Sequence, residues 1–344
     1  MPDLYHAKVR CLLMRRAAFL FIAATGCAAP KGPAKFSATV ESYHEGARIA
    51  VVGDMQRTAP TLEFWREQND GERRQVVEAI AEAKPSLLMV TGDNVFNGGS
   101  HAQWESFDEL TAPLRKAEVP VATAFGNHEY WVGLQRAEAH VFPRFALNAG
   151  RHWFTIPFGP LRLVVLDSNE SELTPVQWSS QATWFAGTLE MFDHDDGVRG
   201  VVVLFHHPPF TNSSVTGDEI DVQEAFVPPF KRAHKTIAML NGHVHSYERY
   251  MRDGKTYVVS GGGGGPRARL KIGDGRRHKD DQCSEPALRD FHFALYTVNK
   301  EGVSTEVRGL PKGGTVWRVL DRFDLQWPAL THVISANARG RLVH

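Results

Sequence analysis

The chain has 344 residues, of which 42% are hydrophobic and 23% are charged, a composition typical of a globular protein with a sizeable core. The 39 lysines and arginines balance the 39 aspartates and glutamates, which argues against a nucleic-acid-binding surface, because such surfaces need excess cations to displace counterions from phosphates. Three cysteines are too few for a disulfide framework and form no CxxC zinc pattern. No apolar run reaches the ~18 residues of a membrane-spanning helix. The unusual number is 16 histidines.

Residues 1–26 show the features of a secretory signal peptide in the usual order. Two arginines precede a compact apolar run over residues 17–24, and small residues follow directly before Cys27. This ending resembles the lipobox of bacterial lipoproteins, in which Cys27 would carry the lipid, although Ala24 stands where that box usually has leucine. The alternative is a small buried helix. We therefore expect an exported protein of the bacterial cell envelope, periplasmic or at the outer surface, held at a membrane by an N-terminal lipid anchor.

The rest of the chain divides into three predicted parts. Residues 27–46 are rich in alanine, proline, glycine, serine and lysine, which predicts a tether. Residues 47–310 carry regular apolar segments and are expected to form one folded domain. Within them, residues 266–290 are charged and aperiodic, which predicts a long surface loop. Residues 311–344 have no pattern that assigns them, and the oligomeric state is not encoded in any motif.

Short apolar runs alternate with amphipathic stretches through the predicted domain. This alternation predicts an α/β fold in which mostly parallel strands are covered on both faces. A turn at 158–160 predicts a hairpin, and Thr174 followed by Pro175 predicts the start of a helix. The expected strands are 48–52, 87–90, 120–124, 153–156, 161–166, 201–205, 236–240, 256–260, 291–299 and 302–308, and further helices are expected after Asp70 and near 101–116.

Five of these strands end directly before residue types that bind metal ions. Because ligands bind at the carboxyl ends of strands in open α/β sheets, we expect the five ends to converge on one sheet edge. A single aspartate after a strand is usually a turn residue, and a single histidine usually belongs to the core, but neither explanation covers five ends together. The residues are Asp54, Asp93, the run Asn127-His128-Glu129, the pair His206-His207, and His243 with His245.

Two aspartates, one asparagine and three histidines are more ligands than one metal ion uses. The mixture of oxygen and imidazole nitrogen suits a pair of Fe, Mn or Zn ions, whose identity the sequence does not determine. Two ions ~3.5–4 Å apart can hold the attacking and leaving oxygens of an in-line displacement. Hydrolysis of a phosphoester is the chemistry that benefits most, because the uncatalysed reaction is among the slowest in biology.

The same residues resemble the five motifs of the calcineurin-like metallophosphoesterases, in that family's order and over about residues 48–250. The motifs at 126–129 (GNHE) and 242–245 (GHVH) are specific, whereas the two Gly-Asp motifs are not. The run 242–249 (GHVHSYER) and the run 205–208 (FHHP) are similar to the purple acid phosphatase branch and its bacterial members. The resemblance implies that residues 47–310 form a four-layer α-β-β-α sandwich with its active site at the C-terminal ends of the strands.

The resemblance also implies a function and a role for each ligand position. The protein would hydrolyse phosphoesters as an acid-phosphatase-like phosphomonoesterase or a phosphodiesterase, with a small-molecule substrate and a metal-bound hydroxide as the nucleophile. His128 would stabilise the developing charge or protonate the leaving oxygen, and Glu129 would orient His128. Asp93 would bridge the two metals, Asp54 and His245 would complete the first site, and Asn127, His206 and His243 would hold the second metal.

Two positions depart from the family pattern, and both concern the first metal. Gln56 stands where the broad family often has histidine, and Phe96 stands where the purple branch has the tyrosine that binds iron and gives the colour. Gln56 still offers a carbonyl oxygen, a weaker donor than imidazole or phenolate. The sequence therefore predicts a colourless protein with a looser first site.

Other positions leave alternatives open. His207 either faces the substrate or lies on the surface beside a proline-rich turn, and residues 247–249 are expected to be structural. The glycines at 261–265 form either a tight turn or a backbone surface that approaches substrate near His245. The loops 94–104, 207–220 and 266–290 are expected to line the cleft.

Three classes of function remain. The favoured one is the hydrolase. The second is a catalytically degenerate metal-binding lipoprotein that retains only the second metal, supported by Gln56 and Phe96 and opposed by the intact Asp93 and His128. An adhesion or scaffold module would leave the ligand residues at the strand ends unexplained.

Overall fold

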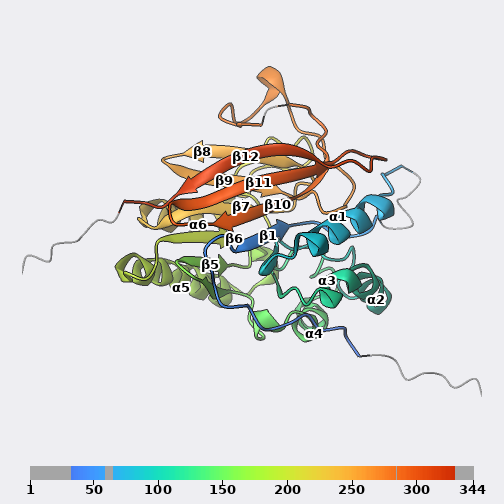
Figure 1. Cartoon of the computed structure of the whole chain (residues 1–344), viewed down its shortest axis with the longest axis horizontal. Helices are drawn as coiled ribbons and strands as arrows, with labels where there is room; N and C mark the ends of the chain where they lie inside the picture. The colour runs from blue at the N-terminus through green and yellow to red at the C-terminus, as the bar shows by residue number, and fades with distance from the viewer. Residues whose placement is uncertain (1–31, 59–64, 284, 330–344) are drawn as a thin grey trace, which may run out of the picture. The chain divides into compact units, whose positions relative to one another are not determined.

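The computed structural model describes residues 32–58, 65–283 and 285–329, which fold into two six-stranded sheets with helices outside them (Figure 1). No helix among these residues is both long and apolar enough to cross a bilayer. The predicted signal peptide and Cys27 lie outside the described residues.

The strands are β1 (Arg48–Val52), β2 (Leu87–Val90), β3 (Val121–Thr123), β4 (Phe154–Phe158), β5 (Leu161–Val165), β6 (Gly200–Leu204), β7 (Thr236–Asn241), β8 (Tyr247–Arg252), β9 (Lys255–Ser260), β10 (Phe291–Val298), β11 (Gly302–Leu310) and β12 (Arg318–Gln326). The helices are α1 (Asp70–Ala83), α2 (His101–Leu110), α3 (Ala112–Lys116), α4 (Leu134–Arg144), α5 (Pro175–His194) and α6 (Ile220–Arg232).

Both sheets contain parallel and antiparallel strands. The first sheet has the order β12-β11-β10-β1-β2-β3, in which β1, β2 and β3 are parallel and the C-terminal strands are antiparallel. The second sheet has the order β4-β5-β6-β7-β9-β8, in which β5, β6, β7 and β9 are parallel and both edge strands are antiparallel. The α/β class and the hairpin of β4 and β5 are thereby confirmed. Parallel pairing is limited to two groups of neighbouring strands.

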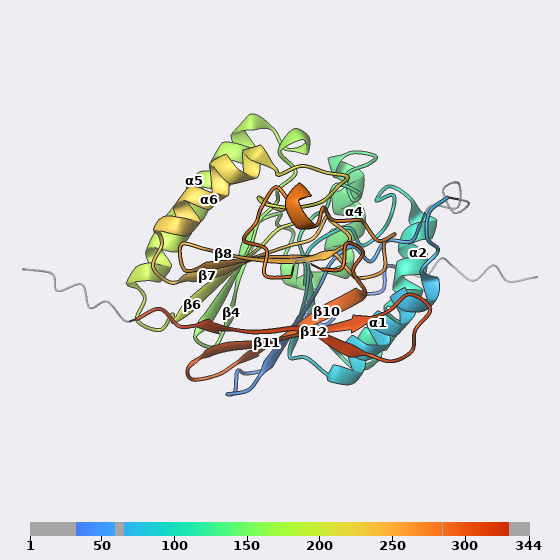
Figure 2. The same cartoon turned by 90° about the horizontal axis from the view of Figure 1, so that it is seen from above.

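The central strands are apolar on both faces because both faces are covered. In β1, Ile49 and Val51 belong to the apolar cluster between the sheets, whereas Ala50 and Val52 pack beneath α1, α2 and α4. Strands of the second sheet divide in the same way between the first sheet and the helices α5 and α6. Figure 2 shows α5 and α6 on one side and α1, α2 and α4 on the other. The layers are therefore helix, sheet, sheet, helix, as the family resemblance implies.

The five ligand-bearing strand ends do not share one sheet edge, so that expectation was wrong. β1, β2 and β3 belong to the first sheet, whereas β6 and β7 belong to the second. The ligands still meet, since Asp93 after β2 lies 3.3 Å from His206 after β6. Stacking of the two sheets, which strand periodicity does not reveal, brings the two groups of strand ends together.

The structure also changes both ends of the predicted domain. The segment 33–46, expected to be part of a tether, packs on the fold, because Phe36 is buried against the rings of Phe107 and Phe145. At the other end β12 pairs with β11, so part of the unassigned segment 311–344 completes the first sheet. The folded domain therefore extends past residue 310.

The Tyr-Glu-Arg run at the start of β8 is structural, as expected. Tyr247 donates its hydroxyl to Asp321 of β12 at 2.8 Å, and Arg249 Nε donates to the same carboxylate at 2.6 Å. Glu248 accepts a hydrogen bond from the amide of Asn212 at 2.6 Å. These contacts join the second sheet to the first and hold the loop that follows β6.

A buried polar cluster joins α4 to the end of β5. His152 Nδ1 lies 3.0 Å from an oxygen of Asp167, and His152 Nε2 lies 2.9 Å from Glu138. The Tyr130 hydroxyl donates to the same Asp167 carboxylate. Burial alone would lower the pKa of His152, but the hydrogen bonds and charges of Asp167 and Glu138 outweigh burial and raise it.

We expect the His152 imidazolium to stabilise the fold more in acid than in alkali. Because folding raises the pKa of His152, its contribution is complete below the unfolded value of about 6.5 and is lost as pH rises through the folded value. His152→Gln should therefore cost about 1–2 kcal/mol at about pH 6 and less at about pH 9. Urea unfolding of both proteins across this range measures the difference. A difference that does not change with pH would contradict the assignment.

Candidate metal centre

Three of the predicted ligands follow their strands in a left-handed backbone conformation. The φ angles are 60° at Asp54, 56° at Asp93 and 66° at His243. Each such residue costs roughly 1–3 kcal/mol, and strain of this kind persists mainly at functional sites. A glycine precedes each of them and leaves the necessary space; a Cβ on Gly92 would lie 2.7 Å from the amide nitrogen of Gly126. These tight turns direct all three side chains into one space between the sheets.

Asn127, His206 and His243 bring three donor atoms together. Asn127 Oδ1 lies 3.1 Å from His206 Nε2 and 3.1 Å from His243 Nδ1, and the two imidazole nitrogens are 3.3 Å apart. Asp93 Oδ2 lies 3.3 Å from His206 Nε2. An amide oxygen only accepts hydrogen bonds and a neutral imidazole has one N–H, so these atoms cannot fully satisfy one another. One metal ion bound among them would satisfy all four, so this donor set fits the second metal.

Asp54, Gln56 and His245 form the other side of the centre. His245 Nε2 lies 3.4 Å from Asp54 Oδ1. Gln56 Nε2 donates to Asp93 Oδ2 at 3.2 Å and lies 3.0 Å from His245 Nε2. Gln56 Oε1 is buried and has no hydrogen-bond partner in the described part of the chain. Turning the amide over would present this oxygen as a ligand, so the residues fit a first metal ion, though less completely than the second.

The buried charges of the centre favour a bound cation. Burial alone would lower the pKa of His206, but the charge and hydrogen bond of Asp93 raise it to about 10. Burial and the charge of His206 lower the pKa of His243 to about 3. Burial raises the pKa of Asp93, but the charges of His206 and His128 outweigh it and hold the pKa well below its usual value. The metal-free protein therefore keeps a proton on His206, and metal binding should release that proton.

Backbone carbonyls fix the orientation of three histidine rings. In each ring Nδ1 donates to a carbonyl oxygen, which turns Nε2 toward the centre. This arrangement requires no particular side chain, so no residue type in the sequence indicates it. The pairs are His206 with Thr91 at 2.9 Å, His245 with Pro266 at 2.7 Å and His128 with Phe96 at 2.6 Å.

The sequence predicts that Glu129 orients His128, but the structure gives Glu129 another role. Its buried carboxylate accepts hydrogen bonds from the amides of Asp93 at 2.9 Å and Gly126 at 2.7 Å. Burial and the charge of Asp93 raise the pKa of Glu129 to about 7. Glu129 points back under the two ligand loops and joins them, while the carbonyl of Phe96 holds His128.

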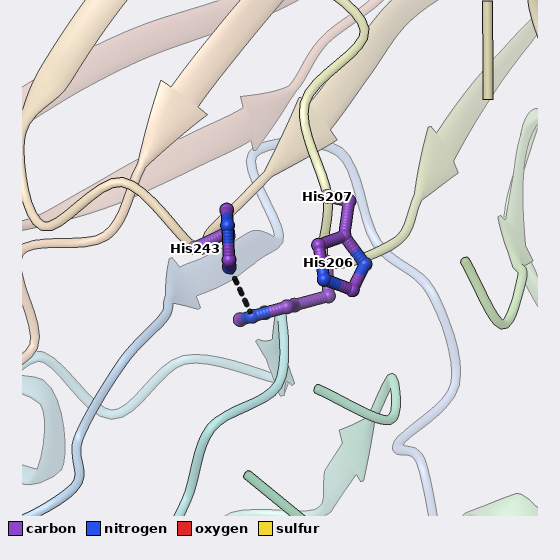
Figure 3. Close-up of side chains that lie close together, drawn as sticks. All are labelled: His206, His207 and His243. Carbon is purple, nitrogen blue, oxygen red and sulfur yellow. Dashed lines mark hydrogen bonds between the residues drawn. The ribbon is translucent and has the colours of Figure 1, made fainter. Parts of the chain in front are cut away.

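His207 lies beside His206 and His243 (Figure 3). Its ring centroid is 4.8 Å from that of His206 and 4.5 Å from that of His243, and its Nδ1 lies 3.0 Å from the hydroxyl of Ser168. Burial and the charge of His206 hold the pKa of His207 well below its usual value. Of the two alternatives from the sequence, the structure favours a site residue over a surface histidine.

The glycine run at 261–265 supports the first-metal side through its backbone. The amide of Gly263 donates to the carbonyl of Gly53 at 2.8 Å, and the amide of Gly265 donates to the carbonyl of Asp54 at 2.9 Å. These two amides are therefore engaged by the backbone of the first ligand loop. A Cβ on Gly265 would lie 2.7 Å from the His245 ring. Only glycine at this position therefore lets the backbone pass so close to a ligand residue.

Replacing Gly265 by alanine is expected to displace His245 and weaken the first metal site. The added methyl overlaps the imidazole, and overpacking of this kind costs about 1–3 kcal/mol. Elemental analysis after metal reconstitution and thermal melting measure the two effects. Gly187→Ala in α5 is the matched control, because nothing lies within 4 Å of its added methyl. Full metal content in Gly265→Ala would show that the contact does not matter.

A cleft of about 460 Å³ opens over the centre. Metal-ligand candidates such as Asp93 and His243 line it, together with residues from 213–216 and 266–269. This confirms two of the three loops expected to line it. The third, 94–104, supplies no lining residue among those described, whereas the unexpected segment 65–67 does.

Comparison with known proteins assigns the chain to a family. Residues 47–247, more than half of the chain, match the family described as Calcineurin-like phosphoesterase. The chain belongs to this family. The matched region contains every ligand candidate from Asp54 to His245, which agrees with the resemblance found in the motifs.

The chain is similar to curated plant proteins. It is 23% identical to Purple acid phosphatase 18 of Arabidopsis thaliana over 263 residues, covering 71% of this chain and 55% of that protein. It is 29% identical to Purple acid phosphatase 1 of Ipomoea batatas over 184 residues, covering 49% of this chain and 38% of that protein. The chain thus spans about half the length, or less, of these relatives.

Solved structures share the fold of this chain. A purple acid phosphatase from yellow lupin (Lupinus luteus) seeds has a TM-score of 0.65 at 20% identity, covering 83% of this chain and 55% of that one. The anchor in the inner membrane complex of Plasmodium has a TM-score of 0.59 at 14% identity, covering 82% and 89%. Because phosphatases and an anchor share this fold, activity must be argued from the site.

One strand end with polar residues was not recognised in the sequence. Asp167, Ser168 and Asn169 follow β5 as the ligands follow other strands. Ser168 binds His207, and Asn169 Nδ2 donates to the carbonyl of Phe125 at 3.0 Å. The signal was the same as at the five recognised ends, a run of short polar residues directly after an apolar strand.

Proposed function

We propose that this member of the family is a metal-dependent hydrolase that acts on a small-molecule phosphoester through a dinuclear centre, as an acid-phosphatase-like phosphomonoesterase or a phosphodiesterase. The observation that carries the proposal is the position of Asp93. Its Oδ2 lies 3.3 Å from His206 Nε2 on one side and 3.2 Å from Gln56 Nε2 on the other. A carboxylate shared by two groups of ligands is what a bridge between two metal ions requires.

The metal ions supply the activation of water and the neutralisation of phosphate charge. This chain supplies the ligands and keeps them in place before metal arrives, through the strained turns and the carbonyl-bound imidazoles. Fe, Mn and Zn all suit the donor set. One ion would be held by Asp93, Asn127, His206 and His243, and the other by Asp54, Asp93 and His245 with the oxygen of Gln56.

His128 is the side chain placed to act on substrate oxygens. Because its Nδ1 donates to Phe96, its Nε2 faces the cleft, 3.8 Å from Asp93 Oδ2. A protonated Nε2 can donate to a phosphoryl oxygen or give its proton to the leaving oxygen. The ring of Trp131 packs on His128 with centroids 4.3 Å apart and keeps it in this orientation.

The second candidate function is metal binding without turnover. Gln56 favours it, since its amide nitrogen lies between two ligands of the first metal. The placement of His128 beside Asp93 opposes it, because a binding site alone has no need of a proton donor facing the cleft. A scaffold would leave the strained turns at Asp54 and His243 unexplained.

Metal reconstitution followed by assay decides between these candidates. The purified chain is loaded with Fe, Mn or Zn, its metal content is measured by elemental analysis, and phosphate monoesters and diesters are offered as substrates. About two ions per chain and turnover of at least one ester class are expected. One ion or none without turnover would favour the binding protein.

Iron-loaded protein is expected to be colourless. Phe96 has no phenolate to bind iron, and its ring packs against His128 and Trp131 with centroids 5.0 Å and 4.5 Å apart. The visible absorption spectrum of the iron-loaded chain measures this. A phenolate-to-iron absorption band would contradict the prediction and would imply that another tyrosine reaches the centre.

We also propose, from the sequence alone, that the chain is exported to the bacterial cell envelope and anchored by lipid on Cys27. Metabolic labelling with a radioactive fatty acid tests this. Label is expected on the wild type and not on Cys27→Ala, and equal labelling of the two would contradict the anchor.

A further inference from the structure

We propose that Arg66 and Arg269 form a second anion subsite in the cleft, which selects phosphoesters whose leaving group carries a further phosphoryl group. The inference rests on the proposed function, since it names a substrate class for the same centre. Both arginines line the cleft that contains Asp93, Asn127 and His128. A phosphoryl group bound at the centre would therefore have these guanidinium groups within the same enclosure.

The backbone that carries Arg269 is fixed beside a metal ligand. The amide of Ala268 donates to the carbonyl of His245 at 2.9 Å, and the carbonyl of Pro266 binds the His245 ring at 2.7 Å. Ser214 donates its amide at 2.9 Å and its hydroxyl at 2.8 Å to the carbonyl of Arg269 itself. Arg269 therefore extends from a held segment rather than from a free loop.

Arg66 is joined to the same segment through its neighbour. The Glu67 carboxylate accepts hydrogen bonds from Arg267 Nη2 at 2.7 Å, Nε at 3.1 Å and the backbone amide at 3.2 Å. The carbonyl of Glu67 accepts a further hydrogen bond from the hydroxyl of Thr58 at 2.5 Å. The ion pair of Glu67 and Arg267 thus holds Arg66 near the segment that carries Arg269.

Charge pairing separates these two arginines from the third arginine of the wall. Arg267 is neutralised by Glu67, which is the one carboxylate besides Asp93 among the described residues of the cleft. Neither Arg66 nor Arg269 forms a hydrogen bond or ion pair through its guanidinium within the described residues. Among the described residues the wall therefore carries two positive charges without a carboxylate partner, which attract a second anion and match the fork geometry of phosphate.

A polar side chain on the same wall supports the assignment. Thr216 lines the cleft, and its hydroxyl is buried without a hydrogen-bond partner in the described part of the chain. A buried hydroxyl without a partner is unfavourable unless a ligand or water completes it. A phosphoryl oxygen held by the two arginines would supply an acceptor in this cleft.

The test compares ADP with AMP, which differ by one phosphoryl group. Calorimetry measures the binding of each to the full metal-loaded chain carrying His128→Ala, so that hydrolysis does not interfere. ADP is expected to bind about tenfold tighter than AMP. Adding Arg66→Ala and Arg269→Ala together should reduce this preference to about onefold, and each single change should reduce it in part.

Arg232→Ala is the matched control. Arg232 is also an exposed arginine, but it lies in the last turn of α6, before β7, whereas the ligands follow the other end of that strand. The control should keep the tenfold preference. The subsite would be overturned if the double arginine variant kept the tenfold preference for ADP over AMP. It would also be overturned if the chain with both arginines intact showed no preference for ADP.

Hydrolysis distinguishes this result from the proposed function. If the loaded wild type cleaves neither p-nitrophenyl phosphate nor ADP, the proposed function fails, while the binding comparison still decides the subsite. If it cleaves both, the ratio of kcat/KM for ADP to that for p-nitrophenyl phosphate should fall about tenfold in the double variant. An unchanged ratio would overturn the subsite and leave the hydrolase standing.

Discussion

Replacing Asp93 by asparagine is expected to reduce phosphoester hydrolysis at least about 10³-fold and to lower the metal content to about one ion or less per chain. Asp93 Oδ2 lies between His206 Nε2 and Gln56 Nε2, where one charged oxygen serves both sides of the centre. An amide oxygen carries no charge and cannot compensate two cations. Elemental analysis and kcat/KM for p-nitrophenyl phosphate measure the two effects.

Asp281→Asn is the control for Asp93→Asn. Asp281 is also a buried aspartate, and it accepts a hydrogen bond from the amide of Cys283 at 2.9 Å, away from the ligand loops. Its variant should keep metal content and turnover. Circular dichroism shows whether both variants fold. If Asp93→Asn folds and keeps more than about a tenth of the wild-type turnover, the assignment of Asp93 as the bridging ligand is contradicted.

The second large effect is expected at Gln56, where histidine should tighten the first metal site at least about tenfold. In the wild type an N–H of Gln56 points at Asp93 and His245, where a ligand would present a lone pair. An imidazole supplies that lone pair and adds a stronger donor than an amide oxygen. Metal titration in the presence of a competing chelator measures the apparent affinity of both proteins.

Gln56→Leu determines what glutamine itself does. If the Oε1 of Gln56 is a ligand, leucine removes it, and the chain should lose the first ion while keeping the second. If the amide only fills the space, leucine should leave the metal content unchanged. Gln56→His with unchanged affinity would contradict the assignment of this position to the first metal.

The ligand positions were predictable because each is a local pattern. An apolar strand, a glycine and a polar residue are contiguous in the sequence, and the strained turns at Asp54, Asp93 and His243 explain why the pattern has that form. The helix start at Thr174 was predictable for the same reason, since its side chain accepts from the amide of Gln177 within one turn.

The remaining features depend on residues far apart in the chain. The local sequence does not indicate that β3 and β6 belong to different sheets, because both are short apolar runs before ligand residues. The carbonyls that hold His128 and His245 come from backbone that any residue provides. The role of Glu129 could not be predicted because its carboxylate binds the amide of Asp93, which follows a different strand, as well as that of Gly126.

The chain order of the first sheet has a consequence for synthesis of the protein. This sheet is made from two separated pieces, β1 to β3 and β10 to β12, with the whole second sheet encoded between them. A nascent chain that has reached His245 contains every metal ligand, yet β1 still lacks its neighbour β10, which begins at Phe291. An unpaired strand edge and a late, long-range pairing both slow folding and favour association with other chains. Pairing of β10 with β1 is therefore a late step of folding, and a chain cut after β9 would retain all the ligands of the centre but lack β10, β11 and β12, which complete the sheet whose strands β1, β2 and β3 precede Asp54, Asp93 and Asn127.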